Sequence, residues 1–327
     1  MNKRLSYFIR PSIMSLMCIT LIIIILFSPL SVLEISKALA QDTKPPSGSK
    51  EFNKYYELGL KHYEEKKYEE AIKAFNKVLE INPKSADAYF KIGRCYSRLN
   101  KLVESTKSYE KAIQIDPDGS YPIYFHLGLN YYNLKDYDKA IESLQKAIKI
   151  KPDTYYFTYF SLANSYYNKK DYENAVKYLN ETIKRKPDYE IAYFILSKSH
   201  QQLGNYKGAI KVLDDGLKQK PNSLTIIESL AWLLSTSPPD ELRDAKRAVI
   251  LAERAVDFTK GEDPIHLDTL AAAYAEAGRY QDAIKTQEKA INLLMNSQAS
   301  SGIDSSLIEE FKKRLSYYKE NKPWRIE

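Results

Sequence analysis

Residues that usually carry chemistry are scarce in this chain. Its 327 residues include two cysteines, Cys18 and Cys95, and four histidines that lie far apart in the sequence. There is no HExxH, CxxC or CxxCH pattern, no glycine-rich phosphate loop and no GxSxG turn. These absences exclude the ligand patterns typical of zinc and of covalently attached haem, and also the familiar nucleophile turns. We therefore expect no metal site, no cofactor and no catalytic site, and we interpret the protein as non-enzymatic.

Charge of one sign is not concentrated in any block. The net charge is +7 and 28% of the residues are charged, but no long block of like charge stands out. This balance does not indicate a nucleic-acid partner. Tyrosine, by contrast, is abundant: the chain has 27, and all but four of them precede Asn222. The two halves of the protein therefore differ in chemical character.

The first forty residues resemble a targeting segment. Three basic residues among the first ten are followed by an apolar run over 13–27 and by the small-residue ending 38–40. This layout predicts a secretory signal peptide cleaved after Ala40. An uncleaved membrane anchor is the alternative, because 13–33 has no charge and is long enough to span a bilayer. Both interpretations predict export to the periplasm or cell envelope, and membrane contact only if the segment is retained.

The next feature is a repeat that ends in proline. KYEEAIKAFNKVLEINP is followed by four related phrases at a period of 34 or 35 residues. The closing prolines are Pro83, Pro117, Pro152, Pro187 and Pro221. Each phrase, and the segment before it, has apolar residues at helical spacing, so each repeat predicts two antiparallel helices. Proline then ends the second helix, because it lacks the backbone donor and disfavours helix in the preceding residue.

Small residues recur at fixed places in each repeat. Positions are counted from the start of each first helix, so that position 8 is Gly59 in repeat 1. Position 8 is Gly59, Gly93, Gly128, Ala163 and Ser197, and position 20 is Ala71, Ser105, Ala140, Ala175 and Ala209. With the closing proline, this pattern resembles the tetratricopeptide repeat (TPR). The resemblance implies an all-α, right-handed superhelical solenoid of about seven repeats and a C-terminal capping helix.

The pattern also divides the chain. The predicted parts are 1–40, the signal peptide or anchor; 41–51, a flexible linker; 52–221, five regular repeats; 222–294, two divergent repeats; and 295–327, a loop with a capping helix. The loop is expected over 296–306. The capping helix is expected to turn an apolar stripe, which includes Phe311 and Tyr318, onto the last repeat.

The resemblance implies a ligand-binding groove lined by the first helices. The candidate groove residues at positions 5, 9 and 12 are Tyr56, Tyr63, Phe90, Arg94, Phe125, Leu129, Tyr132, Phe160, Asn164, Tyr167, Phe194 and Lys198. Aromatic rings offer large contact area at low conformational cost, which suits a peptide or helix ligand. The position-5 rings also fit a second interpretation, as core between neighbouring repeats.

These features together predict a non-catalytic scaffold or adaptor. It would bind a protein or peptide in an aromatic groove, and a glycan-binding role in envelope machinery is the alternative. TPR proteins that clamp the carboxylate tails of chaperones have Lys at position 5 and Asn at position 9. Only Asn164 matches that pattern, so a chaperone-tail receptor is not expected. Nucleic-acid binding conflicts with both the predicted export and the modest charge.

Overall fold

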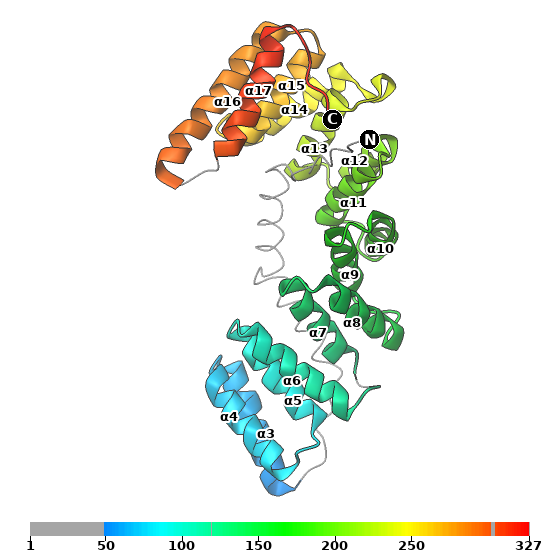
Figure 1. Cartoon of the computed structure of the whole chain (residues 1–327), viewed down its shortest axis with the longest axis vertical. Coiled ribbons are helices and arrows are strands. Elements are labelled where there is room, and N and C mark those ends of the chain that lie inside the picture. The colour runs from blue at the N-terminus through cyan, green and yellow to red at the C-terminus, as the bar shows by residue number, and fades with distance from the viewer. Residues whose placement is uncertain (1–48, 119, 302–304, 327) are drawn as a thin grey trace, which may run out of the picture. The chain divides into compact units, whose positions relative to one another are not determined.

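The computed structural model describes residues 49–118, 120–301 and 305–326. In this part of the chain it contains fifteen α-helices, one short 3-10 helix and no strand (Figure 1). The predicted targeting segment and most of the predicted linker lie outside the described residues. Within the described ranges, no helix is both long and apolar enough to cross a membrane. The chain forms two compact units, divided at Pro221 and Asn222.

The first unit, the N-terminal array, holds five helix pairs. The pairs are α3 (Lys50–Glu64) with α4 (Tyr68–Ile81), α5 (Ala86–Arg98) with α6 (Leu102–Ile115), α7 (Tyr121–Asn133) with α8 (Tyr137–Ile150), α9 (Tyr156–Asn168) with α10 (Tyr172–Arg185), and α11 (Glu190–Gln202) with α12 (Tyr206–Gln219). Each helix packs on the next along the chain. The predicted antiparallel pairs are therefore confirmed, although α3 begins at Lys50, two residues before the expected start of the first repeat at 52.

Local sequence signals explain where these helices begin and turn. Ser49 and Ser85 cap α3 and α5 by accepting backbone N–H donors, and Asp136 and Asp171 cap α8 and α10 in the same way. Such caps satisfy donors that the first helical turn leaves unpaired. The turn inside every pair has one residue with positive φ at position 15, namely Lys66, Asn100, Lys135, Lys170 and Gly204.

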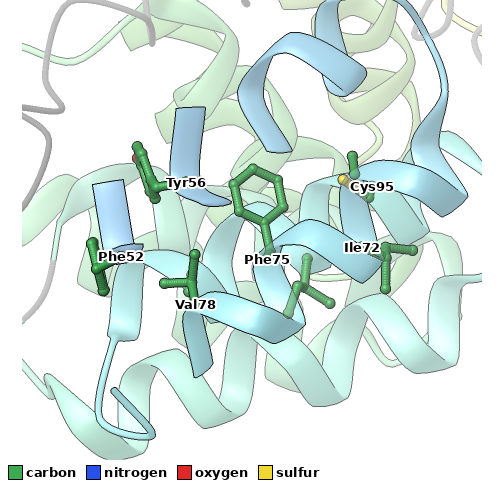
Figure 2. Packing of buried hydrophobic residues seen from close by; sticks show 9 residues of the cluster. Phe52, Tyr56, Ile72, Phe75, Val78 and Cys95 are labelled. Atoms are coloured by element: carbon green, nitrogen blue, oxygen red, sulfur yellow. The ribbon is translucent and has the colours of Figure 1, made fainter. Parts of the chain in front are cut away.

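The position-8 glycines let the two helices of a pair approach closely. A Cβ atom added at Gly59 would lie 2.6 Å from the ring of Phe75, and one at Gly93 would lie 2.5 Å from the ring of Tyr109. Figure 2 shows the cluster of buried residues formed by α3, α4 and α5. Phe75 lies at its centre, with Phe52 and Tyr56 from α3 on one side. Large side chains of the second helix thus fill the space that the small residue leaves, at the density of a protein core.

Cys95 belongs to this core. It is fully buried in the cluster that joins repeats 1 and 2, on the same side of Phe75 as Ile72 (Figure 2). Burial raises the pKa of its thiol to about 12, so the side chain stays neutral. Cys95 therefore acts as a small apolar packing residue.

The second unit, the C-terminal array, holds the two divergent repeats. Its helices are α13 (Leu224–Thr236), the 3-10 helix η2 (Asp240–Leu242), α14 (Ala245–Phe258), α15 (Pro264–Glu276), α16 (Tyr280–Ser301) and α17 (Ser305–Lys319). Asp263 caps α15, with Pro264 as its first residue. The expectation of a loop from Asn296 is corrected, because α16 continues to Ser301. No glycine or proline interrupts the helical pattern before that residue, and Gly302 follows it.

α17 covers the last repeat. Leu307, Ile308 and Phe311 are buried against Ile291 and Leu294 of α16. These contacts hide an apolar face that the final helix pair of a repeat array would otherwise expose to water. α17 therefore lies where a capping helix is needed.

Candidate functional site

The aromatic side chains at position 5 lie in the core. Between 1% and 6% of their surface is exposed, and the five are Tyr56, Phe90, Phe125, Phe160 and Phe194. The Tyr56 hydroxyl donates to Asp87 of the next repeat at 2.5 Å, and the ring of Phe125 meets that of Phe157 edge-on at 6.4 Å. The groove interpretation of position 5 is therefore corrected: these side chains are buried, and Tyr56, Phe90, Phe125 and Phe160 contact side chains of the next repeat.

The position-4 tyrosines have a second structural role. In three repeats their hydroxyl donates to the carbonyl of the proline that closes the previous repeat, at 2.6–2.8 Å: Tyr124 to Pro117, Tyr159 to Pro152 and Tyr193 to Pro187. Each proline comes directly after the C-cap residue of a second helix, so its carbonyl lies outside the backbone hydrogen bonds of that helix. Part of the tyrosine excess therefore fastens one repeat to the next.

The position-12 tyrosines remain partly exposed. The rings of Tyr63, Tyr132 and Tyr167 each pack against the tyrosine that opens the second helix of the same repeat, with centroids 5.5, 5.8 and 5.5 Å apart. Asn168 of repeat 4 also donates to the Tyr132 hydroxyl at 3.2 Å. Burial raises the pKa of Tyr132 to about 12, so its hydroxyl stays a neutral donor and acceptor. The three rings are therefore held in fixed orientations. We call the side of the first helices that carries positions 9 and 12 the first-helix surface.

The position-9 residues are more varied. Leu60, Arg94, Leu129 and Lys198 are half-buried, whereas Asn164 is only 3% exposed. The Asn164 amide nitrogen is buried and has no hydrogen-bond partner in the described chain. Of the predicted groove residues, the structure thus leaves those at positions 9 and 12 accessible on the first-helix surface, except Asn164.

Two arginines converge on the first of these tyrosines. Arg94 and Arg98, one helical turn apart on α5, both donate to the Tyr63 hydroxyl, at 3.1 and 3.3 Å. The Arg94 guanidinium also lies over the Tyr63 ring, 4.8 Å from its centroid, and 5.9 Å from that of Phe90. Such cation–π contacts hold the Arg94 guanidinium in place without neutralising its charge.

The histidines show no arrangement for catalysis or metal binding. The described residues contain no group of three potential metal ligands among His, Cys, Asp and Glu side chains. His126 lies among aromatic rings, 5.7 Å from that of Phe90 and 5.9 Å from that of Tyr109. Burial, and then the charges of Arg94 and Arg98, lower the pKa of His126 to about 3, so it is neutral at physiological pH.

The corresponding surface of the C-terminal array is covered by the chain itself. Trp232, Glu228 and Asp268 occupy positions 9 and 5 of the divergent repeats and are at most 9% exposed. Arg314 of α17 reaches them: its Nε lies 2.7 Å from Asp268, and its guanidinium lies over the Trp232 ring at 5.5 Å. Asp268 at position 5 thus binds a cation from the chain's own capping helix, and Glu228 accepts a hydrogen bond from the Thr269 hydroxyl at 3.1 Å.

The segment after α17 extends this cover. Arg325 forms an ion pair with Glu276 of α15 at 2.6 Å and donates to the Ser235 carbonyl of α13 at 3.3 Å. The backbone N–H of Ile326 donates to the Thr236 carbonyl at 3.0 Å. These contacts occupy carbonyls at the C-terminal end of α13. The accessible first-helix surface is therefore that of the N-terminal array.

Sequence reasoning missed two cationic residues on this side of α5. Lys91 stands at position 6 and Arg98 at position 13, which the predicted groove set did not include. Positions 6, 9 and 13 are three and four residues apart and therefore share a face, so the periodicity of the helix gave the signal for both residues. The burial of Lys91 gave no such signal, because it depends on the packing around position 6.

Comparison with known protein families identifies the repeats. A TPR repeat model matches residues 59–100, and a tetratricopeptide repeat model matches residues 86–118 and 121–154. A model of subunit 3 of the anaphase-promoting complex matches residues 150–216. No curated protein sequence matches the chain.

Solved structures share the fold. The C-terminal part of a TPR repeat-containing protein from Cytophaga hutchinsonii aligns with a TM-score of 0.58 at 19% identity, over 78% of this chain and 98% of that one. A MamA protein aligns at 0.51 and 24% identity, over 53% and 94%. YrrB, described as a TPR protein with an unusual peptide-binding site, aligns at 0.50 and 18% identity, over 54% and 89%. At these identities the likeness concerns the fold.

Proposed function

We propose that this tetratricopeptide-repeat protein is a non-catalytic scaffold that holds a segment of a partner protein on the first-helix surface of its N-terminal array. The observation that carries the proposal is the row of position-12 tyrosines, Tyr63, Tyr132 and Tyr167. Each ring is fixed by a neighbouring tyrosine and still partly exposed. A fixed aromatic ring loses little conformational entropy when it binds, so it contributes affinity efficiently.

The N-terminal array is the better candidate of the two. Its position-9 and position-12 side chains alternate between aromatic, apolar and polar types, which suits an amphipathic or extended segment. In the C-terminal array, Arg314 and Arg325 already occupy the equivalent surface. A partner protein would have to displace a buried ion pair there, whereas the surface of repeats 1–5 needs no such rearrangement.

Site-specific photocrosslinking tests this proposal. A photoreactive phenylalanine derivative replaces Tyr132 or Tyr167 in one set of variants. In the matched control set it replaces Tyr166 or Tyr178, which stack on each other 5.5 Å apart on α9 and α10. We expect discrete protein adducts in vivo from positions 132 and 167 and none from 166 and 178. Equal amounts of adduct from both sets would contradict a binding site on the first-helix surface. Adducts that survive protease digestion would indicate that the ligand is a glycan.

We propose further that the protein works outside the cytoplasm, in the periplasm or cell envelope. This proposal rests on the basic, apolar and small-residue layout of residues 1–40. Cell fractionation followed by sequencing of the mature amino terminus tests it. Gln41 at the amino terminus indicates a cleaved signal peptide, an intact terminus in the membrane fraction indicates an anchor, and full-length protein in the cytoplasm contradicts export.

A further inference from the structure

Three cations occupy one face of α5. Lys91, Arg94 and Arg98 follow one another at spacings of three and four residues, so their side chains leave the helix on the same side. Lys91 is only 7% exposed, although lysine is rarely buried without an anionic partner. We call these three residues the α5 cation row.

The row lacks the carboxylates that neutralise other arginines of this protein. Arg185, Arg243, Arg279, Arg314 and Arg325 each form an ion pair with an aspartate or glutamate. Within the described parts of the chain, no carboxylate lies within 4 Å of a side-chain nitrogen of Lys91, Arg94 or Arg98. Asp87, one turn before Lys91, accepts the Tyr56 hydroxyl.

This arrangement is unfavourable for the protein alone. Like charges one helical turn apart repel each other, and burial disfavours the charged form of a lysine. The pKa of Lys91 is accordingly lowered, first by burial and with a further contribution from Arg94, against the opposing effect of Asp87. An anion bound beside the row would reduce the repulsion between the three cations. It would also give the buried Lys91 ammonium a partner of opposite charge.

The surroundings also hold the row in place. Two guanidiniums share the Tyr63 hydroxyl, and Arg94 is further fixed by the rings beneath it. A guanidinium has five N–H donors, so both arginines keep donors that can form paired hydrogen bonds with a carboxylate. His126 is close by, and its Nε2 atom is buried without a hydrogen-bond partner in the described residues.

We propose that the α5 cation row binds the carboxylates of an acidic segment of the partner protein. This inference rests on the proposed function and names the chemistry of its ligand. The row lies at the start of the tyrosine surface, since Tyr63 belongs to both. Acidic side chains would therefore fix the register of the segment at repeats 1 and 2, and its aromatic or aliphatic residues would contact Tyr132 and Tyr167.

Fluorescence anisotropy with the full mature chain tests the inference. The probe is a fluorescein-labelled twelve-residue peptide of alternating glutamate and leucine, and its counterpart carries glutamine in place of glutamate. We expect the glutamate peptide to bind at least tenfold more tightly than the glutamine peptide at low salt. The double variant Arg94→Gln/Arg98→Gln should bind the glutamate peptide at least tenfold more weakly than the parent. Arg94→Lys/Arg98→Lys should lose less affinity, because lysine keeps the positive charge but lacks the planar guanidinium that forms paired hydrogen bonds with a carboxylate.

The matched control is Lys107→Gln/Lys111→Gln on α6, the second helix of the same repeat. It removes the same net charge from exposed positions and should leave affinity within about twofold of the parent. An equal loss in both double variants, or equal binding of the two peptides, would overturn the inference. Crosslinks from Tyr132 and Tyr167 that persist after such a result would show that the surface binds a segment of other chemistry.

Discussion

At the scale of the residue, side-chain size at position 8 decides how closely two helices approach. Gly93 lies against Tyr109, and Gly128 lies against Leu144, whose Cγ would be 2.6 Å from an added Cβ. Both large side chains are fully buried, so neither can move aside without disturbing the core. The small residue is therefore a packing requirement, which explains its recurrence in every repeat.

Gly93→Ala tests this requirement. The added Cβ would meet the ring of Tyr109 at 2.5 Å, and we expect a loss of about 1–3 kcal/mol in the free energy of unfolding. Urea unfolding followed by circular dichroism measures the loss. Lys107→Ala, at an exposed position of α6, is the control and should stay within about 0.5 kcal/mol of the parent. A Gly93→Ala variant as stable as the parent would show that the helices can separate at little cost.

A second prediction at this scale concerns His126. Its pKa is lowered to about 3 in the folded protein, whereas an ordinary histidine titrates near 6.5. Between these values the unfolded chain takes up a proton that the folded protein refuses, so stability falls as the pH drops below about 6.5. The slope from this one residue is at most about 1.4 kcal/mol per pH unit.

His126→Phe should remove that contribution while keeping a ring among Phe90 and Tyr109. We expect the stability of the parent minus that of the variant to decrease from pH 7 to pH 5, as measured by urea unfolding at each pH. His200 and His266, whose pKa values are also lowered by burial, remain in both proteins and cancel in the difference. A difference that does not change with pH would mean that the folded protein protonates His126 readily.

At the scale of the element, α17 is joined to the C-terminal array by a buried ion pair as well as by apolar contacts. Asp268 is 2% exposed, and it accepts from Arg314 and from the Gln287 amide, each at 2.7 Å. An isolated buried charge is costly, whereas an apolar pair of similar volume at both positions can be neutral. The pair therefore fixes the position of α17 more clearly than it adds to stability.

Arg314→Met should destabilise the C-terminal array by about 3–5 kcal/mol, because it leaves the Asp268 carboxylate buried beside a single amide. The double variant Arg314→Met/Asp268→Leu should recover at least half of that loss. Trp232 and Trp324, the two tryptophans of the chain, both lie in this array, so urea unfolding followed by tryptophan fluorescence measures the effect. A double variant no more stable than the single one would argue against the buried charge as the cause.

At the scale of the whole molecule, the two arrays have different cores and different spectroscopic probes. Most of the tyrosines are in the N-terminal array, and both tryptophans are in the C-terminal array. In repeat proteins, stability is approximately a sum of the contributions of each repeat and of its contacts with its neighbours. A substitution in one array is therefore expected to act mainly on that array.

Two variants test this independence together. Gly93→Ala should lower the midpoint of the circular-dichroism transition that belongs to unfolding of the N-terminal array. The transition followed by tryptophan fluorescence should stay unchanged. Arg314→Met should shift the tryptophan transition and leave a second, unshifted transition in the circular dichroism. If either variant shifts both signals by the same amount, the chain unfolds as one cooperative unit.

The sequence by itself determined the repeated helix pair, because a helix is encoded by the spacing of apolar residues along one segment. It also determined the close approach at position 8 and the ends at the closing prolines, which depend on the shape and backbone of single residues. The TPR family and the all-helical fold predicted from these signals are confirmed. The predicted cleavage of residues 1–40 remains a prediction.

Tertiary structure decided which residues remain available for a ligand. The position-5 rings are buried and the position-12 rings are partly exposed, although both are aromatic residues on the same helices. Their difference depends on how closely the neighbouring repeat approaches. The convergence of Arg94 and Arg98 on Tyr63, and the cover that Arg314 places over Asp268, join residues 31 to 46 positions apart. Such contacts are set by packing between helices, which a helical period along one segment does not contain.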